Sequence, residues 1–236
     1  KINNTDNTIA IGTEAGHIGQ QTNSVAIGMA AGNTSQGTNS VAIGNLAGNT
    51  GQEHSSVAIG LIAGNANQGI QSVAIGSAAG FLNQGDQSTS IGHEAGGQSQ
   101  GKKSVAIGYQ AGLNVQGTNS VAIGSGAGFL NQTNNSIIIN ATSDNLNNTV
   151  ADSFVVKPIR EQFGNQVLLY DNESGEITRN SDVSLNNLDV SGDTTVKGSL
   201  KVDGAVTLDN VDIGSGTIDG TSIGASSSAT GRFTYL

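Results

Sequence analysis

The sequence predicts an all-β protein whose first half is a β-solenoid, a stack of coils with one coil per 16-residue repeat. Three observations predict this fold: a repeat of constant length, a short apolar strand in each repeat, and an unusual composition. Of the 236 residues, 35 are Gly, while 3% are aromatic and 11% are charged. Large side chains normally supply most of the buried area of a core. Here burial has to come from many small, regular contacts.

The repeat recurs without insertion or deletion. The element TIAIG, SVAIG, STSIG or SIIIN begins at residues 8, 24, 40, 56, 72, 88, 104, 120 and 136. Eight full repeats therefore occupy residues 8–135, and positions within a repeat are numbered 1 to 16. Position 5 is always Gly, positions 8 and 9 are always Ala-Gly, and position 13 is always Gln. Such a strict register is expected where each coil contacts only its two neighbours.

Positions 1 to 4 predict a strand, whose alternate side chains point to opposite faces. We expect Val25, Ile27 and their equivalents to fill the coil. The opposite face would be a column of small residues, with Ala10 and Ser90 at two of its positions. A strand that is apolar on both faces is normally covered on both, so this column predicts an oligomer; a flat, exposed alanine stripe is the alternative. The predicted oligomer column consists of Ala26, Ala42, Ala58, Ala74, Ala106 and Ala122.

The glutamines at position 13 predict a second regular feature. Coils of a β-solenoid lie about 4.8 Å apart, which lets identical amides hydrogen-bond along the stack. Each amide can donate to one neighbour and accept from the other. Since Gln does not titrate, we expect a structural role. The predicted ladder consists of Gln20, Gln36, Gln52, Gln68, Gln84, Gln100, Gln116 and Gln132.

The repeated NSVAIG element, with its following Ala and Gly, resembles the head repeats of trimeric autotransporter adhesins. The resemblance covers residues 8 to about 140. It implies a left-handed β-roll that trimerises side by side, although parallel β crossovers in general favour the right hand. The 16-residue period and the fixed Gln depart from the shorter units of that family.

The sequence changes character after the repeats. SIIIN, residues 136–140, replaces Ala and Gly by larger residues, as a terminal coil would, so we expect a β-roll domain over residues 1–140. A linker and a β-hairpin module are expected at residues 141–182, with strands at residues 167–170 and 176–179. This module resembles one found in fibre proteins of marine phages and large DNA viruses.

Residues 183–236 predict an intertwined trimeric β shaft. Short apolar alternations are interrupted by Gly, Asp or Asn every few residues, and single hairpins of this length are marginal alone. Three chains wound together would bury these residues along a common axis. The ending GTIDGTSIGASSSATGRFTYL resembles a recurrent element of phage tail-fibre shafts. The chain begins with Lys and ends within this pattern, so we expect a processed chain or a fragment.

No group of residues predicts a catalytic, cofactor or metal site. His17, His54 and His93 fall at positions 10, 15 and 6, so they share no column, whereas a metal site needs convergent ligands. No nucleophile, base and orienting group recur together. The net charge of −9 and the few aromatic residues disfavour nucleic-acid binding, and no apolar run is long enough for membrane insertion.

Two apolar pairs break the regular pattern. Phe81-Leu82 and Phe129-Leu130 occupy positions 10 and 11 of the fifth and eighth repeats. We expect them to pack across a subunit boundary or under the following module. A contact patch for a partner is the alternative, because clustered exposed apolar groups mark contacts.

Together these features predict a structural protein and not an enzyme. We expect a homotrimeric fibre of a virion, a phage tail fibre or appendage, that is extracellular and holds or forms a host-attachment element. Its expected partners are other virion or fibre proteins and a host surface glycan or protein. A trimeric cell-surface adhesin head of a bacterium is the alternative. An ice-binding solenoid is disfavoured because no aligned Thr pairs recur, and a depolymerase because no carboxylate pair stands out.

Overall fold

The computed structural model of the chain describes residues 2–3, 7–159, 167–171 and 173–180. Every regular element in this part of the chain is a β-strand, which confirms the predicted fold class. None of the described residues forms a helix that is long and apolar enough to cross a bilayer. The chain divides into two units, residues 1–163 and 164–236. The predicted shaft, residues 183–236, lies outside the described residues.

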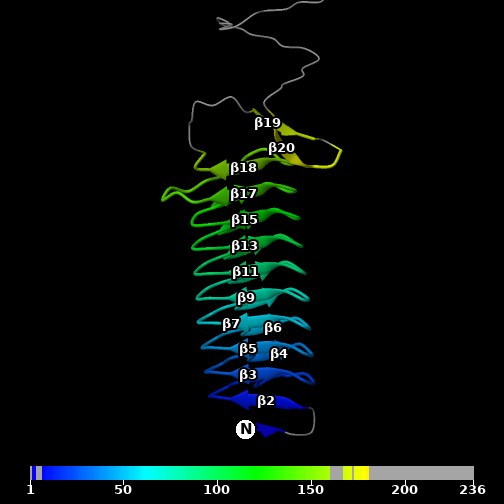
Figure 1. The fold of residues 1–236 in the computed structure, drawn as a ribbon. Helices are drawn as coiled ribbons and strands as arrows, with labels where there is room; N and C mark the ends of the chain where they lie inside the picture. Colours follow the sequence, from blue (N-terminus) through cyan, green and yellow to red (C-terminus); the bar gives the residue numbers. More distant parts are fainter. Residues whose placement is uncertain (1, 4–6, 160–166, 172, 181–236) are drawn as a thin grey trace, which may run out of the picture. The chain divides into compact units, whose positions relative to one another are not determined.

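The first sheet of the solenoid takes one strand from positions 2 to 4 of each repeat. From β2 onward its strands are parallel and in register, so that Ala26 pairs with Ala42, sixteen residues later. Figure 1 shows these strands stacked one above the other along the solenoid. In spatial order they are β1 (Ile2–Asn3), β2 (Thr8–Ile11), β3 (Val25–Ile27), β5 (Val41–Ile43), β7 (Val57–Ile59), β9 (Val73–Ile75), β11 (Thr89–Ile91), β13 (Val105–Ile107), β15 (Val121–Ile123), β17 (Ile137–Asn140) and β18 (Phe154–Lys157).

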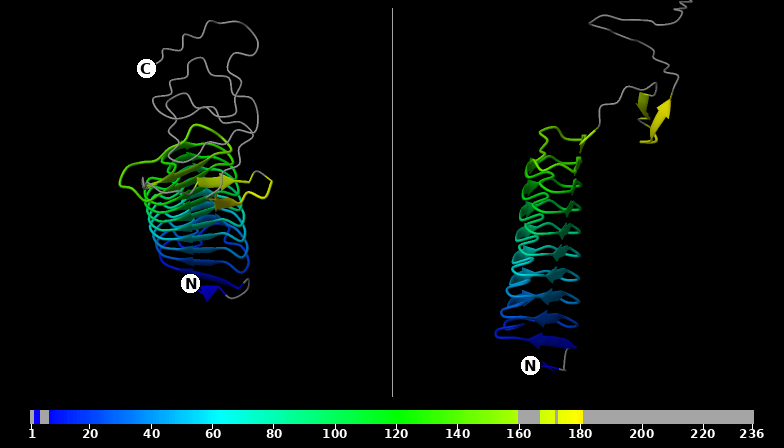
Figure 2. Two further views of the ribbon diagram at one scale, coloured as in Figure 1. Left: turned by 45° about the horizontal axis from the view of Figure 1, so that its top comes forward. Right: turned by 60° about the vertical axis from the view of Figure 1, so that its left-hand side comes forward.

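The second sheet takes a strand from positions 11 to 13 of seven repeats and runs along the other side of each coil (Figure 2). Its pairing is also parallel with a step of sixteen, as between Gln52 and Gln68. In the first repeat a single bridge, Ile18 to Thr34, takes the place of a strand. The strands are β4 (Thr34–Gln36), β6 (Thr50–Gln52), β8 (Ala66–Gln68), β10 (Leu82–Gln84), β12 (Gln98–Gln100), β14 (Asn114–Gln116) and β16 (Leu130–Gln132).

Two corners join the sheets: the first corner at positions 6 to 10 and the second corner at positions 14 to 16. The chain enters the first corner through the glycine of position 5, which explains why that residue never varies. Gly60 has a φ of 134°, and a β-carbon built on it would lie 2.6 Å from the carbonyl oxygen of Gly76 in the next coil. Both the backbone conformation and the close approach therefore exclude a side chain.

The solenoid extends further along the chain than the sequence indicated. Ile138 is fully buried at the position where seven of the eight full repeats have Ala, and it packs in one cluster with Leu146 and Val155. β17 pairs in parallel with β18, so residues 141–157 form one more irregular coil. The expected boundary at residue 140 is therefore too early, and the first unit ends at Phe163.

Asparagine side chains cap the last strand of the second sheet. Asn147 Oδ1 accepts a hydrogen bond from the backbone N–H of Leu130 at 2.8 Å, and Asn148 Oδ1 accepts one from Thr133 at 3.4 Å. These amides replace the strand that a further regular repeat would supply. An exposed strand edge is a template for unwanted pairing, and here its donors are occupied.

The described part of the second unit is an antiparallel pair of strands, β19 (Val167–Tyr170) and β20 (Ile177–Asn180). The first strand has its expected bounds, and the second begins one residue later than expected. Asp171 Oδ1 accepts hydrogen bonds from the backbone N–H groups of Ser174 and Glu173, each at 2.8 Å, and these bonds lower the pKa of its carboxyl group. This Asx turn closes the hairpin.

Candidate assembly and contact surfaces

The interior of each coil is lined by the short side chains of positions 1, 3 and 8 and by the glutamine of position 13. In the fourth repeat Ser56, Ala58, Ala63 and Gln68 are all completely buried. The space is narrow, because a β-carbon built on Gly64 would lie 2.6 Å from Gln68 Oε1 and 3.2 Å from the Ala58 β-carbon. The coil therefore has no room for branched side chains between its two sheets.

The column predicted as an oligomer interface lies in this interior, so that prediction was wrong. Each of its six alanines is 0% exposed in a single chain, and no second chain can reach them. The branched residues of positions 2 and 4, predicted to fill the coil, point outward instead. Val57 and Ile59 of β7 are half-buried, while Ala58 between them is buried. The alternation of the strand was predicted correctly and its phase was not. The residues that line the interior and do not form a subunit interface are Ala26, Ala42, Ala58, Ala74, Ala106 and Ala122.

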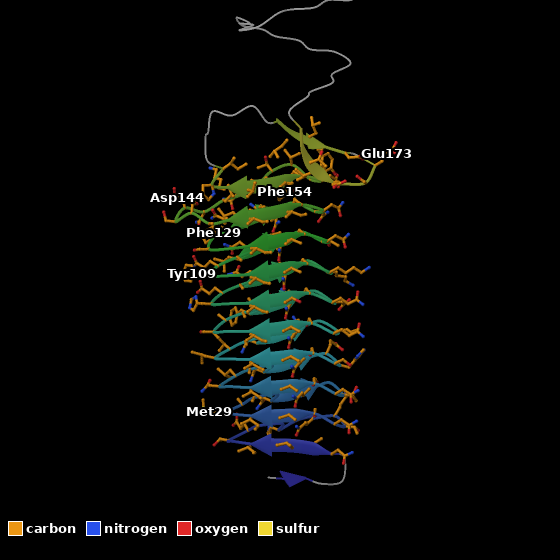
Figure 3. The ribbon with its side chains drawn as sticks, viewed as in Figure 1. Met29, Tyr109, Phe129, Asp144, Phe154 and Glu173 are labelled. Atoms are coloured by element: carbon orange, nitrogen blue, oxygen red, sulfur yellow. The ribbon has the colours of Figure 1, made fainter. Side chains whose placement is uncertain are left out.

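The outward side chains of the first sheet form an apolar surface, here called the Val/Ile face. It consists of positions 2 and 4 of the ten strands from β2 to β18, and all of these residues are Val or Ile except Thr89 and Phe154. Ile11 is 51% exposed and Ile123 is 39% exposed. The sticks on the front of these strands in Figure 3 are short and mostly carbon. A continuous apolar surface without a charge is typical of an interaction site.

The eight glutamines bond mainly within their own coils, so the predicted ladder was wrong for most of the column. Gln36 Nε2 donates to the carbonyl oxygen of Val25 at 2.8 Å, and equivalent bonds recur in the other coils. Among the described residues, one bond joins two of these amides, from Gln100 Nε2 to Gln116 Oε1 at 3.1 Å. The glutamines therefore join the two sheets of one coil.

Several glutamine oxygens in the interior accept no hydrogen bond. This is the state of five Oε1 atoms in the described structure, those of Gln36, Gln52, Gln68, Gln84 and Gln132. A buried acceptor without a partner is destabilising by about 1–3 kcal/mol. The interior of the solenoid thus combines tight packing with incomplete polar pairing.

Amide ladders occur on the second corner, which the sequence interpretation missed. At position 16 Asn7 donates to Asn23 and Asn23 to Asn39, each at 3.2 Å, and Asn119 donates to Asn135 at 3.3 Å. These residues have φ values of 51° to 57°, a left-handed conformation that Asn tolerates better than most residues. The signal that could have found this ladder is the prevalence of Asn and Gln at position 16.

The structure does not bring the two predicted contact pairs together. Phe81 and Phe129 lie in one column on the first corner, three coils apart, which corresponds to about 14 Å. Phe81, Leu82 and Phe129 are half-buried and Leu130 is 44% exposed. They form two separate patches on one edge of the solenoid, and their role as contacts stays a prediction.

Coils six and seven carry a cluster of larger polar and aromatic side chains on the first corner. The rings of His93 and Tyr109, both at position 6, stack with centroids 5.5 Å apart and planes 13° apart. Beside them Gln110 Nε2 donates to Glu94 Oε2 at 2.7 Å. His93 Nδ1 lies 3.8 Å from the same carboxylate oxygen. The sequence analysis did not predict this stack, whose signal is two rings sixteen residues apart.

The second corner holds an ion pair. Lys102 Nζ lies 2.8 Å from Asp86 Oδ2. The hydrogen bond from Lys102, with a second from the backbone N–H of Ile70, lowers the pKa of Asp86, and the carboxylate in turn raises the pKa of Lys102. No group of three or more His, Asp or Glu side chains that could hold a metal ion occurs in the part of the chain that the structure describes.

Comparison with known proteins identifies the type of repeat. The family model of the YadA head domain repeat matches the chain twice, at residues 20–47 and 99–127. No curated protein and no solved structure matches the chain. Repeats of the trimeric autotransporter adhesin family are thus present in this chain, and its β-solenoid is consistent with them. They are repeats of a structural, adhesin-like fold and not of an enzyme family.

Proposed function

We propose that this chain, whose solenoid contains repeats of the YadA head type, is a rigid part of an extracellular attachment fibre in which three copies pack side by side. The Val/Ile face carries this proposal. It runs along the full height of the first sheet, contains no charged residue and leaves Ile side chains up to 51% exposed. The repeats themselves support an adhesin-like, surface-exposed protein.

The magnitudes favour assembly through this face. Full burial of a Val or Ile side chain is worth roughly 1.5–3 kcal/mol, and the half-exposed residues of the face would gain about half of that. Association has to offset a cost of about 4–15 kcal/mol for the loss of translational and rotational freedom. Two such residues on each of ten strands supply enough apolar surface for that. The recurrence of Val at position 2 and Ile at position 4 in most coils lets copies align coil against coil.

The fibre would, in our more specific proposal, belong to a virion as a phage tail fibre or appendage. It would hold or form the host-attachment element and contact other virion or fibre proteins. The support is the ending of the chain, residues 216–236, which resembles phage tail-fibre shafts. A bacterial surface adhesin is the second candidate, favoured by the matched repeats. An antibody against the solenoid distinguishes the two, because it would label purified particles in the first case and bacterial cells in the second.

The assembly is tested by two lysine substitutions in the same coil. Ile91 is 37% exposed on the Val/Ile face, whereas Gln98 is exposed on the second sheet. Light scattering of the full chain should give three times the chain mass of 23.6 kDa. Ile91→Lys should lower this mass, because it would place three charges in the apolar interface, and Gln98→Lys should leave it unchanged. A monomeric unsubstituted chain would refute the proposal.

A further inference from the structure

The aromatic side chains of the eight full repeats gather on the first corner. In residues 8–135 the Phe and Tyr residues are Phe81, Tyr109 and Phe129, and all three occupy position 6 or 10. Figure 3 places Tyr109 and Phe129 on the same edge of the solenoid. His93 adds a fourth ring by stacking on Tyr109. The first corner of coils five to eight thus differs from the same corner of the earlier coils.

The stacked pair keeps a large part of its surface accessible. Tyr109 is 53% exposed, and the His93 side chain is 50% exposed. Their neighbours in the position 6 column are the small residues Ser77 on one side and Ser125 on the other. The pair therefore stands between two short side chains, and no bulky residue of its own column covers the outer ring faces.

Hydrogen-bonding groups are fixed beside the rings. The bond from Gln110 Nε2 holds the Glu94 carboxylate in place at 2.7 Å. A carboxylate offers about four acceptor sites, and an amide oxygen offers two, so both side chains can accept further bonds. Leu113 packs over the bare backbone of Gly97, where an added β-carbon would lie 2.7 Å from Leu113 Cδ1 and 3.2 Å from the Glu94 carbonyl oxygen. Leu113 thus adds an apolar side chain near the Glu94 backbone.

We propose that this corner, formed by His93, Glu94, Tyr109, Gln110 and Leu113, binds a neutral saccharide. A sugar ring has an apolar C–H face and a rim of hydroxyl groups. Exposed aromatic rings can pack against the apolar C–H face, and a preorganised carboxylate–amide pair can hydrogen-bond to the hydroxyl groups. A metal ion is a poor alternative because a single carboxylate lies here. The inference rests on the proposed function, since it names the class of surface molecule that an attachment fibre would contact.

The test uses the three tyrosines of the chain as probes. The full chain is labelled with 3-fluorotyrosine, and its fluorine spectrum is recorded with maltoheptaose, chitotetraose or a galactan oligosaccharide at up to about 10 mM. Tyr109→Phe assigns the Tyr109 signal. Saturable movement of that signal, with the other two unchanged, is the expected result for at least one saccharide. A Tyr109 signal that none of the three moves would overturn the proposal.

Variants locate the site, with binding measured by saturation-transfer NMR of the saccharide. Tyr109→Ser and Glu94→Ala should each weaken binding at least tenfold. Leu61→Ser is the matched control, because Leu61 also occupies position 6, is 53% exposed and lies three coils away; it should not change binding. If Leu61→Ser weakened saccharide binding as much as Tyr109→Ser, the assignment of the site to this corner would be wrong. The mass of each sample separates the two proposals: a trimer that binds no saccharide refutes only this site, whereas a monomer refutes the assembly.

Discussion

Ser90 Oγ donates a 2.7 Å hydrogen bond to Gln100 Oε1 inside the sixth coil. Ser90 stands at position 3, where the seven other full repeats have Ala. It therefore satisfies a buried oxygen of the type that lacks a partner in the fourth coil, at Gln68. The serine that distinguishes STSIG from SVAIG thus gives a buried glutamine oxygen the hydrogen-bond donor that it lacks in several other coils.

Ala58→Ser should reproduce this bond in the fourth coil, because Ala58 and Gln68 occupy the positions of Ser90 and Gln100. We expect the free energy of unfolding to rise by about 0.5–1.5 kcal/mol, the usual net value of a hydrogen bond. Ala58→Val is the control, since it adds volume without a donor and should destabilise the coil by about 1–3 kcal/mol. Denaturant titration measures both changes, and a Ser variant as unstable as the Val variant would contradict the interpretation.

Gly60→Ala should be severely destabilising. The new β-carbon would lie 2.6 Å from the Gly76 carbonyl oxygen, and the φ of 134° is unfavourable for any side chain. We expect a loss of at least about 3 kcal/mol, which a thermal melt will detect. Gly51→Asn is the matched control, because Gly51 has a φ of 66° and its nearest neighbour is the flexible Asn67 side chain. That variant should melt close to the unsubstituted chain.

Val115→Asn should stabilise the solenoid. Val115 has a φ of 57°, although a β-branched residue is strained in the left-handed region, and its side chain is 51% exposed. Asn83 and Asn131 occupy the same repeat position with φ values of 54° and 50°. Relief of the strain should add about 1 kcal/mol to the free energy of unfolding. The reverse change, Asn131→Val, should lower it by a similar amount; no difference between the two variants would argue against strain.

The ion pair between Asp86 and Lys102 should contribute to stability over a wide pH range. The pKa of Asp86 is lowered from 3.8, so its contribution is present above pH 3.8 and is lost as the pH falls through the lower folded value. The pKa of Lys102 is raised from 10.5, so its contribution is present below pH 10.5 and is lost as the pH rises through the higher folded value.

Asp86→Asn tests this pair. It should lower the melting temperature slightly at pH 7 and low salt, because both side chains are solvent-accessible, and the difference from the unsubstituted chain should disappear near pH 2 and in high salt. Glu53→Gln is a control in the third coil, two coils before that of Asp86. A difference that persists at pH 2 would show that the substitution acts through packing.

The sequence predicted the period, the strict glycine and a strand at positions 1 to 4, of which positions 2 to 4 form the strand in most coils, because each follows from local geometry or from exact repetition. It did not determine which face of the strand points inward. Val25 and Ala26 are both apolar, so the alternation alone does not say which of the two faces the interior. The decisive quantity is the distance between the two sheets, which is a tertiary property. The buried partners of Ala26, namely Ser24 and Gln36, suggest in retrospect a narrow interior.

The surfaces were predictable to different degrees. The pair Phe81-Leu82 stands out in the sequence because it breaks a pattern, but that Phe81 lies on a corner and Leu82 in a strand is known only from the structure. The contact of His93 with Tyr109 required knowledge that position 6 faces solvent in consecutive coils. The irregular coil of residues 141–157 was missed because Leu146 reaches the interior three residues later than a regular repeat would place it.

The hydrogen bonds that join successive coils, such as that from Gly28 N to Ile11 O, run along the long axis of the solenoid. A force that pulls the two ends apart would therefore load these bonds one coil after another instead of all at once. Each coil that opens would release sixteen residues, about 55 Å of extended chain. A tether built in this way would lengthen in equal steps under tension and would dissipate mechanical work before its attachment point failed.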